Sequence, residues 1–138
     1  MKTHTTNYFN AFIKVAEDCP VKAAEVPPTK GTEKTAANLQ FEMLYDHPYK
    51  YTSDEVIFQV YAHKQQVTQS EWKSAWEQFF SKGQPCLRSS PLTKRYGWGV
   101  HSDAEGRVAI FAMDSAEYQA LAENAALAQT CAMRSKRA

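Results

Sequence analysis

The stretch YGWGVHSDAEGRVAIFAM, at residues 96–113, gives the clearest indication of the fold. Residues typical of strands alternate on both sides of SDAEGR, which is rich in turn-forming residues. This pattern predicts an antiparallel hairpin with strands at 96–101 and 107–113, joined by a four-residue turn at 103–106.

The two glycines of this hairpin predict a hollow in one face of the sheet. In the register that a four-residue turn implies, Gly99 faces Ile110 and His101 faces Val108, and Gly97 shares their face. Glycine inside a strand usually marks a bulge or the close approach of another group. That group is either a packed helix, the more common case, or a ligand with His101 at the rim of its site.

Two further strands are predicted upstream of the hairpin, at 8–16 and within 51–64. In the first, apolar residues alternate, although a helical spacing through Phe9 and Phe12 competes with this interpretation. In the second, an alternating set is expected to form one face of the strand: Val56, Phe58, Val60 and Ala62.

Three helices are predicted from apolar spacing and capping residues. The first opens at Thr32 and runs to about residue 45, and the last opens at Ser115 with Tyr118 and Leu121 facing inward. The second begins at Ser70, ends near Gly83 and carries an apolar stripe that we expect to be buried: Trp72, Ala75, Trp76, Phe79 and Phe80.

These elements predict an α+β protein in the order β-α-β-α-β-β-α, with a mixed or antiparallel sheet of about four strands and three helices. Residues 1–130 are expected to form a single domain. The basic segment 131–138 is expected to be a frayed tail.

Composition excludes several classes of protein. Sixteen basic and fifteen acidic residues give the 138-residue chain a net charge of +1, which disfavours a dedicated nucleic-acid binder. Cys19, Cys86 and Cys131 are odd in number and form no CxxC pair, so we expect reduced thiols and a cytoplasmic protein. No apolar run is long enough for a membrane span, the amino-terminal residues are too polar for a signal peptide, and the four histidines have no metal-ligand spacing. We therefore expect no metal, cofactor or membrane partner, and nothing in the sequence indicates a homo-oligomer.

The basic region 82–107 is the candidate functional site, because no acidic residue interrupts it before Asp103. We expect it to bind a small anion, phosphate or carboxylate, through six residues: Arg88, Lys94, Arg95, Gly97, Gly99 and His101. A first alternative is an enzyme in which Cys86 is the nucleophile and His101 the base. A second is a protein- or RNA-interaction module with an exposed aromatic patch around Trp98 or Trp76.

Several phrases across the chain resemble a family of small bacterial proteins of unknown function. They include TNYFNAFIKVAEDCP at 6–20, PYKYTSDEV at 48–56 and FFSKGQPCLRSSPLTKRYGWGVHSDAEGRVAI at 79–110. The resemblance implies a free-standing domain to which the basic carboxyl-terminal residues belong. It implies no activity, cofactor or site residue.

Overall fold

The structure is a computed structural model, and it describes residues 4–29 and 31–135. These residues form an α+β fold, as predicted, with four strands and five α-helices instead of the three expected. In chain order the elements are β1 (Ala11–Lys14), α1 (Ala36–Asp46), α2 (Ser53–Gln65), the 3-10 turn η1 (Gln69–Glu71), α3 (Trp72–Phe79), the 3-10 turn η2 (Leu87–Ser89), α4 (Pro91–Lys94), β2 (Trp98–Ser102), β3 (Val108–Ala112), α5 (Ala116–Ala122) and β4 (Ala128–Cys131).

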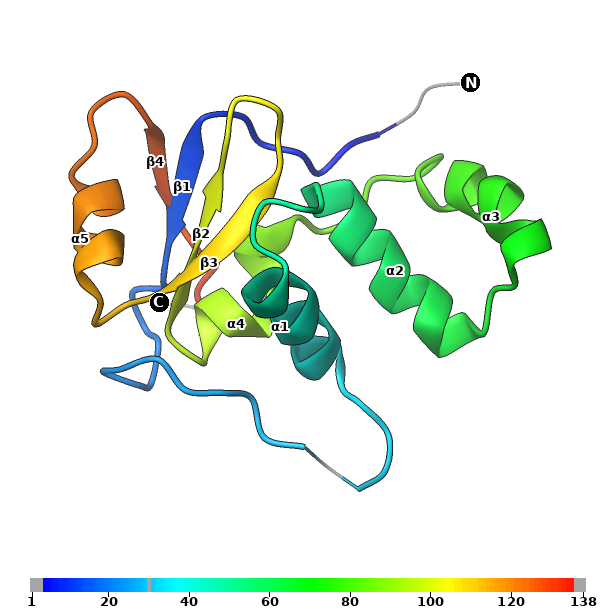
Figure 1. The fold of residues 1–138 in the computed structure, drawn as a ribbon, viewed down its shortest axis with the longest axis horizontal. Coiled ribbons are helices and arrows are strands. Elements are labelled where there is room, and N and C mark those ends of the chain that lie inside the picture. Colours follow the sequence, from blue (N-terminus) through cyan, green and yellow to red (C-terminus); the bar gives the residue numbers. More distant parts are fainter. Residues whose placement is uncertain (1–3, 30, 136–138) are drawn as a thin grey trace.

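The four strands form one mixed sheet in the order β3-β2-β1-β4. β1 lies in the middle, antiparallel to β2 and parallel to β4 (Figure 1). The outer edge of β3 is covered at its start by the segment between α1 and α2, because Val108 accepts a hydrogen bond from Tyr49 N–H and donates one to the Tyr51 carbonyl. A covered edge cannot pair with another chain.

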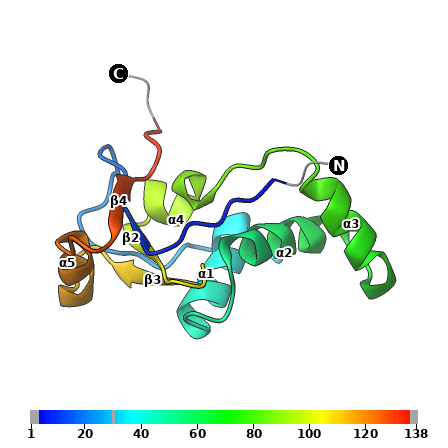
Figure 2. The same ribbon diagram turned by 90° about the horizontal axis from the view of Figure 1, so that it is seen from above.

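Helices lie on both sides of the sheet. α5 packs on one side through Tyr118, while α1 and α4 contact the other (Figure 1). α2 and α3 extend away from the sheet, so that α3 and α5 lie at opposite ends of the molecule (Figure 2). The main core lies between the sheet and α1, α2 and α4, and it includes Ile13, Leu44 and Val100.

Residues 53–65 form helix α2, so the prediction of a strand in this segment was wrong. A capping box opens the helix: Glu55 N–H donates to Thr52 Oγ1 at 3.2 Å, and Thr52 N–H donates to Glu55 Oε1 at 2.9 Å. The alternation that suggested a strand arises because the helix is buried on two sides. Val56 packs in the main core, whereas Phe58 and Ala62 pack in a second cluster with α3.

The second cluster gathers the aromatic stripe of α3 around Phe58, which is completely buried. The helix was predicted correctly, but Ser70 is not its cap: Ser70 lies inside the preceding 3-10 turn η1, whose N-cap is Thr68. Phe80 is buried as expected, whereas Trp72, Trp76 and Phe79 are only half-buried because α3 has little besides α2 to pack against.

The fourth strand is β4, in a segment that was assigned to the closing helix and the frayed tail. α5 ends at Ala122, and the chain returns beside β1. Ala132 is buried in the main core, and Ser135 N–H donates to the Asp18 carboxylate at 2.9 Å. The chain is therefore held through Ser135, while the last three residues of the predicted tail lie outside the described part.

The hairpin was predicted correctly, but its register is shifted by one residue. His101 pairs with Ala109, and Gly99 pairs with Phe111. The loop causes the shift, since Asp103 N–H donates to the Arg107 carbonyl and Gly106 adopts a left-handed φ of 81°. This arrangement is a type I turn followed by a bulge at Gly106, which adds one residue to the expected loop.

Candidate functional site

The hollow predicted beside the hairpin glycines is filled by the chain itself. A Cβ atom on Gly99 would lie 2.6 Å from atoms of both the Phe12 and Tyr118 rings. A Cβ atom on Gly97 would lie 2.9–3.1 Å from Met113, Val21 and Ala24. Neither glycine leaves room for a ligand, because side chains of β1 and α5 and the segment before α1 occupy the space.

His101 lies on the α5 side of the sheet and has a tyrosine as its partner. The Tyr49 hydroxyl and His101 Nδ1 are 2.8 Å apart. Burial lowers the pKa of His101, and the negative charge of nearby Asp103 offsets part of this decrease. A neutral imidazole with its proton on Nε2 accepts the hydroxyl proton of Tyr49 at Nδ1. The φ of Tyr49, 61°, is left-handed and therefore strained.

Cys86 is not brought together with His101. The Cys86 thiol lies 3.5 Å from the Tyr8 hydroxyl, and this hydrogen bond raises the pKa of Tyr8. Leu87, the next residue, packs in the core on the α1 side of the sheet, whereas His101 pairs with Phe12 on the α5 side. The predicted nucleophile and base therefore lie on opposite faces, and the pair needed for that enzyme is not formed.

The basic residues of region 82–107 separate into different environments. Arg88 Nε donates to the Cys131 carbonyl at 2.8 Å and so ties η2 to the end of β4. Arg107 lies at the hairpin turn, where its Nε is 3.8 Å from Glu105 Oε2. Lys82 lines a surface hollow next to Tyr61 and Phe79. Lys94 and Arg95, in contrast, line a common cavity.

That cavity, which we call the cationic cleft, has a volume of about 330 Å³ and lies between α1 and α4. Its walls come from the segment before α1, the first turn of α1, η2, and α4 with the residues after it. They are Pro28, Thr35, Ala36, Ala37, Ser89, Pro91, Lys94, Arg95 and Tyr96.

The first turn of α1 borders the cationic cleft and carries backbone N–H groups without a partner in the described part of the chain. Thr35 and Asn38 form a capping box that satisfies the N–H group of Asn38. The N–H groups of Ala36 and Ala37 have no acceptor within the described part of the chain. The positive end of the helix dipole adds to their attraction for an anion.

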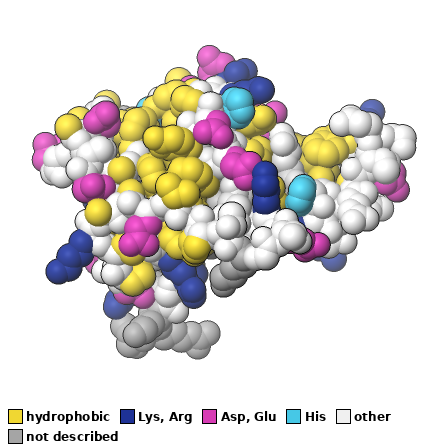
Figure 3. Space-filling model, turned by 60° about the horizontal axis from the view of Figure 1, so that its bottom comes forward, with side chains coloured by type: hydrophobic (Ala, Val, Ile, Leu, Met, Phe, Trp, Pro, Cys, Tyr) yellow, Lys and Arg dark blue, Asp and Glu magenta, His cyan; other side chains and the backbone are white. Residues whose placement is uncertain are grey.

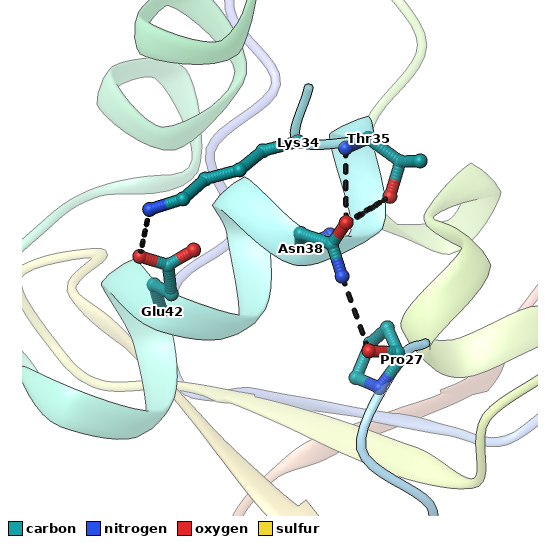
Figure 4. A network of polar contacts seen from close by, with 5 residues as sticks. All are labelled: Pro27, Lys34, Thr35, Asn38 and Glu42. Atoms are coloured by element: carbon teal, nitrogen blue, oxygen red, sulfur yellow. Dashed lines mark hydrogen bonds and ion pairs between the residues drawn. The ribbon is translucent and has the colours of Figure 1, made fainter. Parts of the chain in front are cut away.

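Hydrogen bonds fix the position of this turn (Figure 4). Asn38 Nδ2 donates to the Pro27 carbonyl at 3.1 Å and so holds the preceding segment against the helix. Lys34 points toward Glu42, and its Nζ forms an ion pair with Glu42 Oε1 at 2.7 Å. Among the residues that the structure describes, by contrast, no carboxylate forms an ion pair with Lys94 or Arg95.

The cationic cleft adjoins a second cavity of about 230 Å³, which we call the apolar hollow. The two share Ala36, Ser89 and Pro91 as lining residues. The hollow is lined by residues of α1, α2 and η2, and Cys86, which precedes η2, is one of its lining residues. A single ligand could therefore contact both cavities.

Sequence reasoning found two residues of this site, Lys94 and Arg95, and missed the α1 turn that faces them. The missed turn carries a signal, because Thr35 followed by Asn38 is a capping pattern. It was overlooked because Thr32, three residues earlier, was taken as the helix start. Arg88, Gly97, Gly99 and His101 do not line the cleft.

The tryptophans do not form the exposed patch that an interaction module requires. Trp98 is 7% exposed, donates from Nε1 to the Glu25 carbonyl and lies beneath Phe41 and Tyr45 of α1. Apolar side chains do gather on the face that Figure 3 brings forward, bordered by charged groups. Trp76 is half-buried against Phe58 and Phe80.

Within residues 4–29 and 31–135, no three His, Cys, Asp or Glu side chains are placed to share a metal ion. In the same residues no helix has both the length and the apolar character needed to cross a bilayer.

Comparison with family models matches residues 3–138 to a family of unknown function, DUF6157. The chain belongs to DUF6157. Membership confirms the resemblance seen in the sequence and covers nearly the whole chain, including α1, α4 and both cavities. Comparisons with curated proteins and with solved structures gave no match. The chemistry of the DUF6157 site must therefore be argued from its own residues.

Proposed function

We propose that this protein binds a small anion, a phosphate or a carboxylate, in the cationic cleft. One observation carries the proposal: Lys94 and Arg95 line the same cavity as Ala36 and Ala37, and neither the two cationic side chains nor the two N–H groups of Ala36 and Ala37 have a partner in the described part of the chain. Positive side chains and free helix-terminal N–H groups are the usual components of oxyanion sites.

The hydroxyl of Ser89 supplies a further donor at the cleft wall. Arg95 is exposed and Lys94 is half-buried, so an anion would reach both without a rearrangement of the fold. We also propose a cytoplasmic location, which the three unpaired cysteines support.

The test is the melting temperature of the full chain at low ionic strength, titrated with inorganic phosphate and with acetate. A ligand at a hundred times its Kd adds about 2.7 kcal/mol to the free energy of unfolding. For a chain of 138 residues this corresponds to an increase of about 9 °C.

The variant Lys94→Gln/Arg95→Gln should lose most of this increase. The matched control is Lys82→Gln/Arg107→Gln, which changes the net charge equally outside the cleft and should keep the increase. An equal response in both double variants, or no response beyond that to chloride at the same ionic strength, would show that the cleft is not an anion site.

A further inference from the structure

The apolar hollow contains a hydrogen-bond donor that no protein group uses. Gln40 of α1 lines the hollow and is 7% exposed. Its Oε1 accepts a hydrogen bond from the Ser90 hydroxyl. Its Nε2 has no acceptor within the described part of the chain, although a buried amide nitrogen normally has one.

The orientation of the Gln40 amide follows from its neighbours. Ser90 Oγ accepts a hydrogen bond from Leu92 N–H at 3.2 Å, so its own proton is free to be donated. The Ser90 hydroxyl donates this proton to Gln40 Oε1, so the Gln40 NH₂ group faces away from Ser90. No fully buried side-chain nitrogen or oxygen among the described residues lacks a partner, so Gln40 Nε2 keeps some exposed surface, and Gln40 is a lining residue of the hollow.

The rest of the hollow is mainly apolar. Ile57 and Val60 of α2 form one wall, and Pro85 and Leu87 form another. An amide NH₂ group among such side chains favours a ligand that places one acceptor oxygen there and covers the remaining wall with hydrocarbon.

We propose that the ligand is an N-acyl amino acid or a close analogue, with an anionic head, a carbonyl group and a short apolar chain. The head binds Lys94 and Arg95, the carbonyl oxygen accepts from Gln40 Nε2, and the acyl chain lies against Ile57 and Val60. This inference rests on the proposed anion site for the position of the head. The adjoining cavities, which share Ala36, Ser89 and Pro91, allow one molecule to span both.

The inference is tested by calorimetric titration of the full chain with three probes: acetate, nonanoate and N-hexanoylglycine. Acetate supplies the head alone, and nonanoate supplies head and chain without the carbonyl. N-hexanoylglycine has the same chain length as nonanoate and adds the carbonyl. We expect N-hexanoylglycine to bind roughly three- to tenfold more tightly than nonanoate, as one additional hydrogen bond allows, and nonanoate to bind more tightly than acetate.

The variants Gln40→Met and Gln40→Glu should both remove the preference for N-hexanoylglycine over nonanoate. Gln40→Glu retains an acceptor for the Ser90 hydroxyl, so it separates loss of the donor from loss of that bond. A preference that survives in either folded variant overturns the role of Gln40. A tripeptide with the same terminal carboxylate should bind more weakly than N-hexanoylglycine, and tighter binding would make a peptide the ligand and refute the small-molecule assignment.

Cys86 provides a second measurement in the unaltered protein, because it lines the hollow. N-hexanoylglycine should slow the alkylation of Cys86, followed by peptide mass spectrometry, whereas acetate should not. If acetate or phosphate binds but the longer probes bind no more tightly and give no protection, this inference is wrong and the anion site stands. If no probe binds, both are wrong.

Discussion

Replacing Gly99 with alanine tests the packing of the sheet against α5. The added methyl group would lie 2.6 Å from both the Phe12 and Tyr118 rings, whereas carbon atoms in contact normally lie about 3.5–4.0 Å apart. Phe12 is fully buried and meets Tyr118 edge to face at 5.1 Å, so neither ring can move without disturbing the other. Overpacking of a core typically costs 1–3 kcal/mol, and two simultaneous clashes place Gly99→Ala near about 3 kcal/mol.

For a chain of 138 residues this loss lowers the melting temperature by about 10 °C. Gly83→Ala is the matched control, because its Cβ would meet only His4 at 3.9 Å and its backbone φ is not left-handed. The control should be neutral or up to about 1 kcal/mol more stable. Phe12→Leu should cost less in the Gly99→Ala background than alone, because the smaller side chain relieves the clash. A Gly99→Ala protein as stable as the parent in urea titration would refute the packing argument.

Three further predictions follow from the second cluster, the α2 cap and the buried histidine. Phe58→Ala should lower the free energy of unfolding, measured by urea titration, by about 3–5 kcal/mol. Trp76→Ala should lower it clearly less, because Trp76 is half-buried, and equal losses would contradict the central position of Phe58. Thr52→Ala should cost about 0.5–2 kcal/mol and reduce helical circular dichroism, since it removes the capping box of α2; no loss would show that the cap contributes nothing. Because burial lowers the pKa of His101, its contribution to stability is complete above about pH 6.5 and is lost as the pH falls through the folded-state pKa. The decrease in urea midpoint between pH 7 and pH 5 should therefore be smaller in His101→Gln, and an unchanged decrease would assign the pH dependence to other groups.

The fold class was predictable because its strongest signals are local. The hairpin and the α3 helix are each defined by their own turn residues and apolar spacing. The prediction of a strand at 53–65 was wrong for a physical reason. Val56 and Phe58 pack in different apolar clusters on two sides of one helix, and this pattern of burial resembles the alternation of a strand. The local signal that would have decided the assignment is the capping box formed by Thr52 and Glu55.

The site was harder to predict because it depends on contacts between distant segments. Nothing local indicates that Ala36 lies across a cleft from Lys94, or that Gln40 is buried against Ser90. The prediction of a ligand-binding hollow was wrong for the same reason, because Phe12 and Tyr118, which are remote in the sequence, fill the space beside Gly99. A register error of one residue also reversed the faces assigned to β3.

The central place of β1 in the sheet has a consequence for the biosynthesis of this protein. β1 leaves the ribosome well before either of its neighbours: Phe12 waits for His101, and Ala11 waits for Ala128. Pairings between such remote parts of a chain form slowly. The nascent chain must therefore carry an apolar, unpaired strand until β2 has been made, a state that favours aggregation and binding by chaperones.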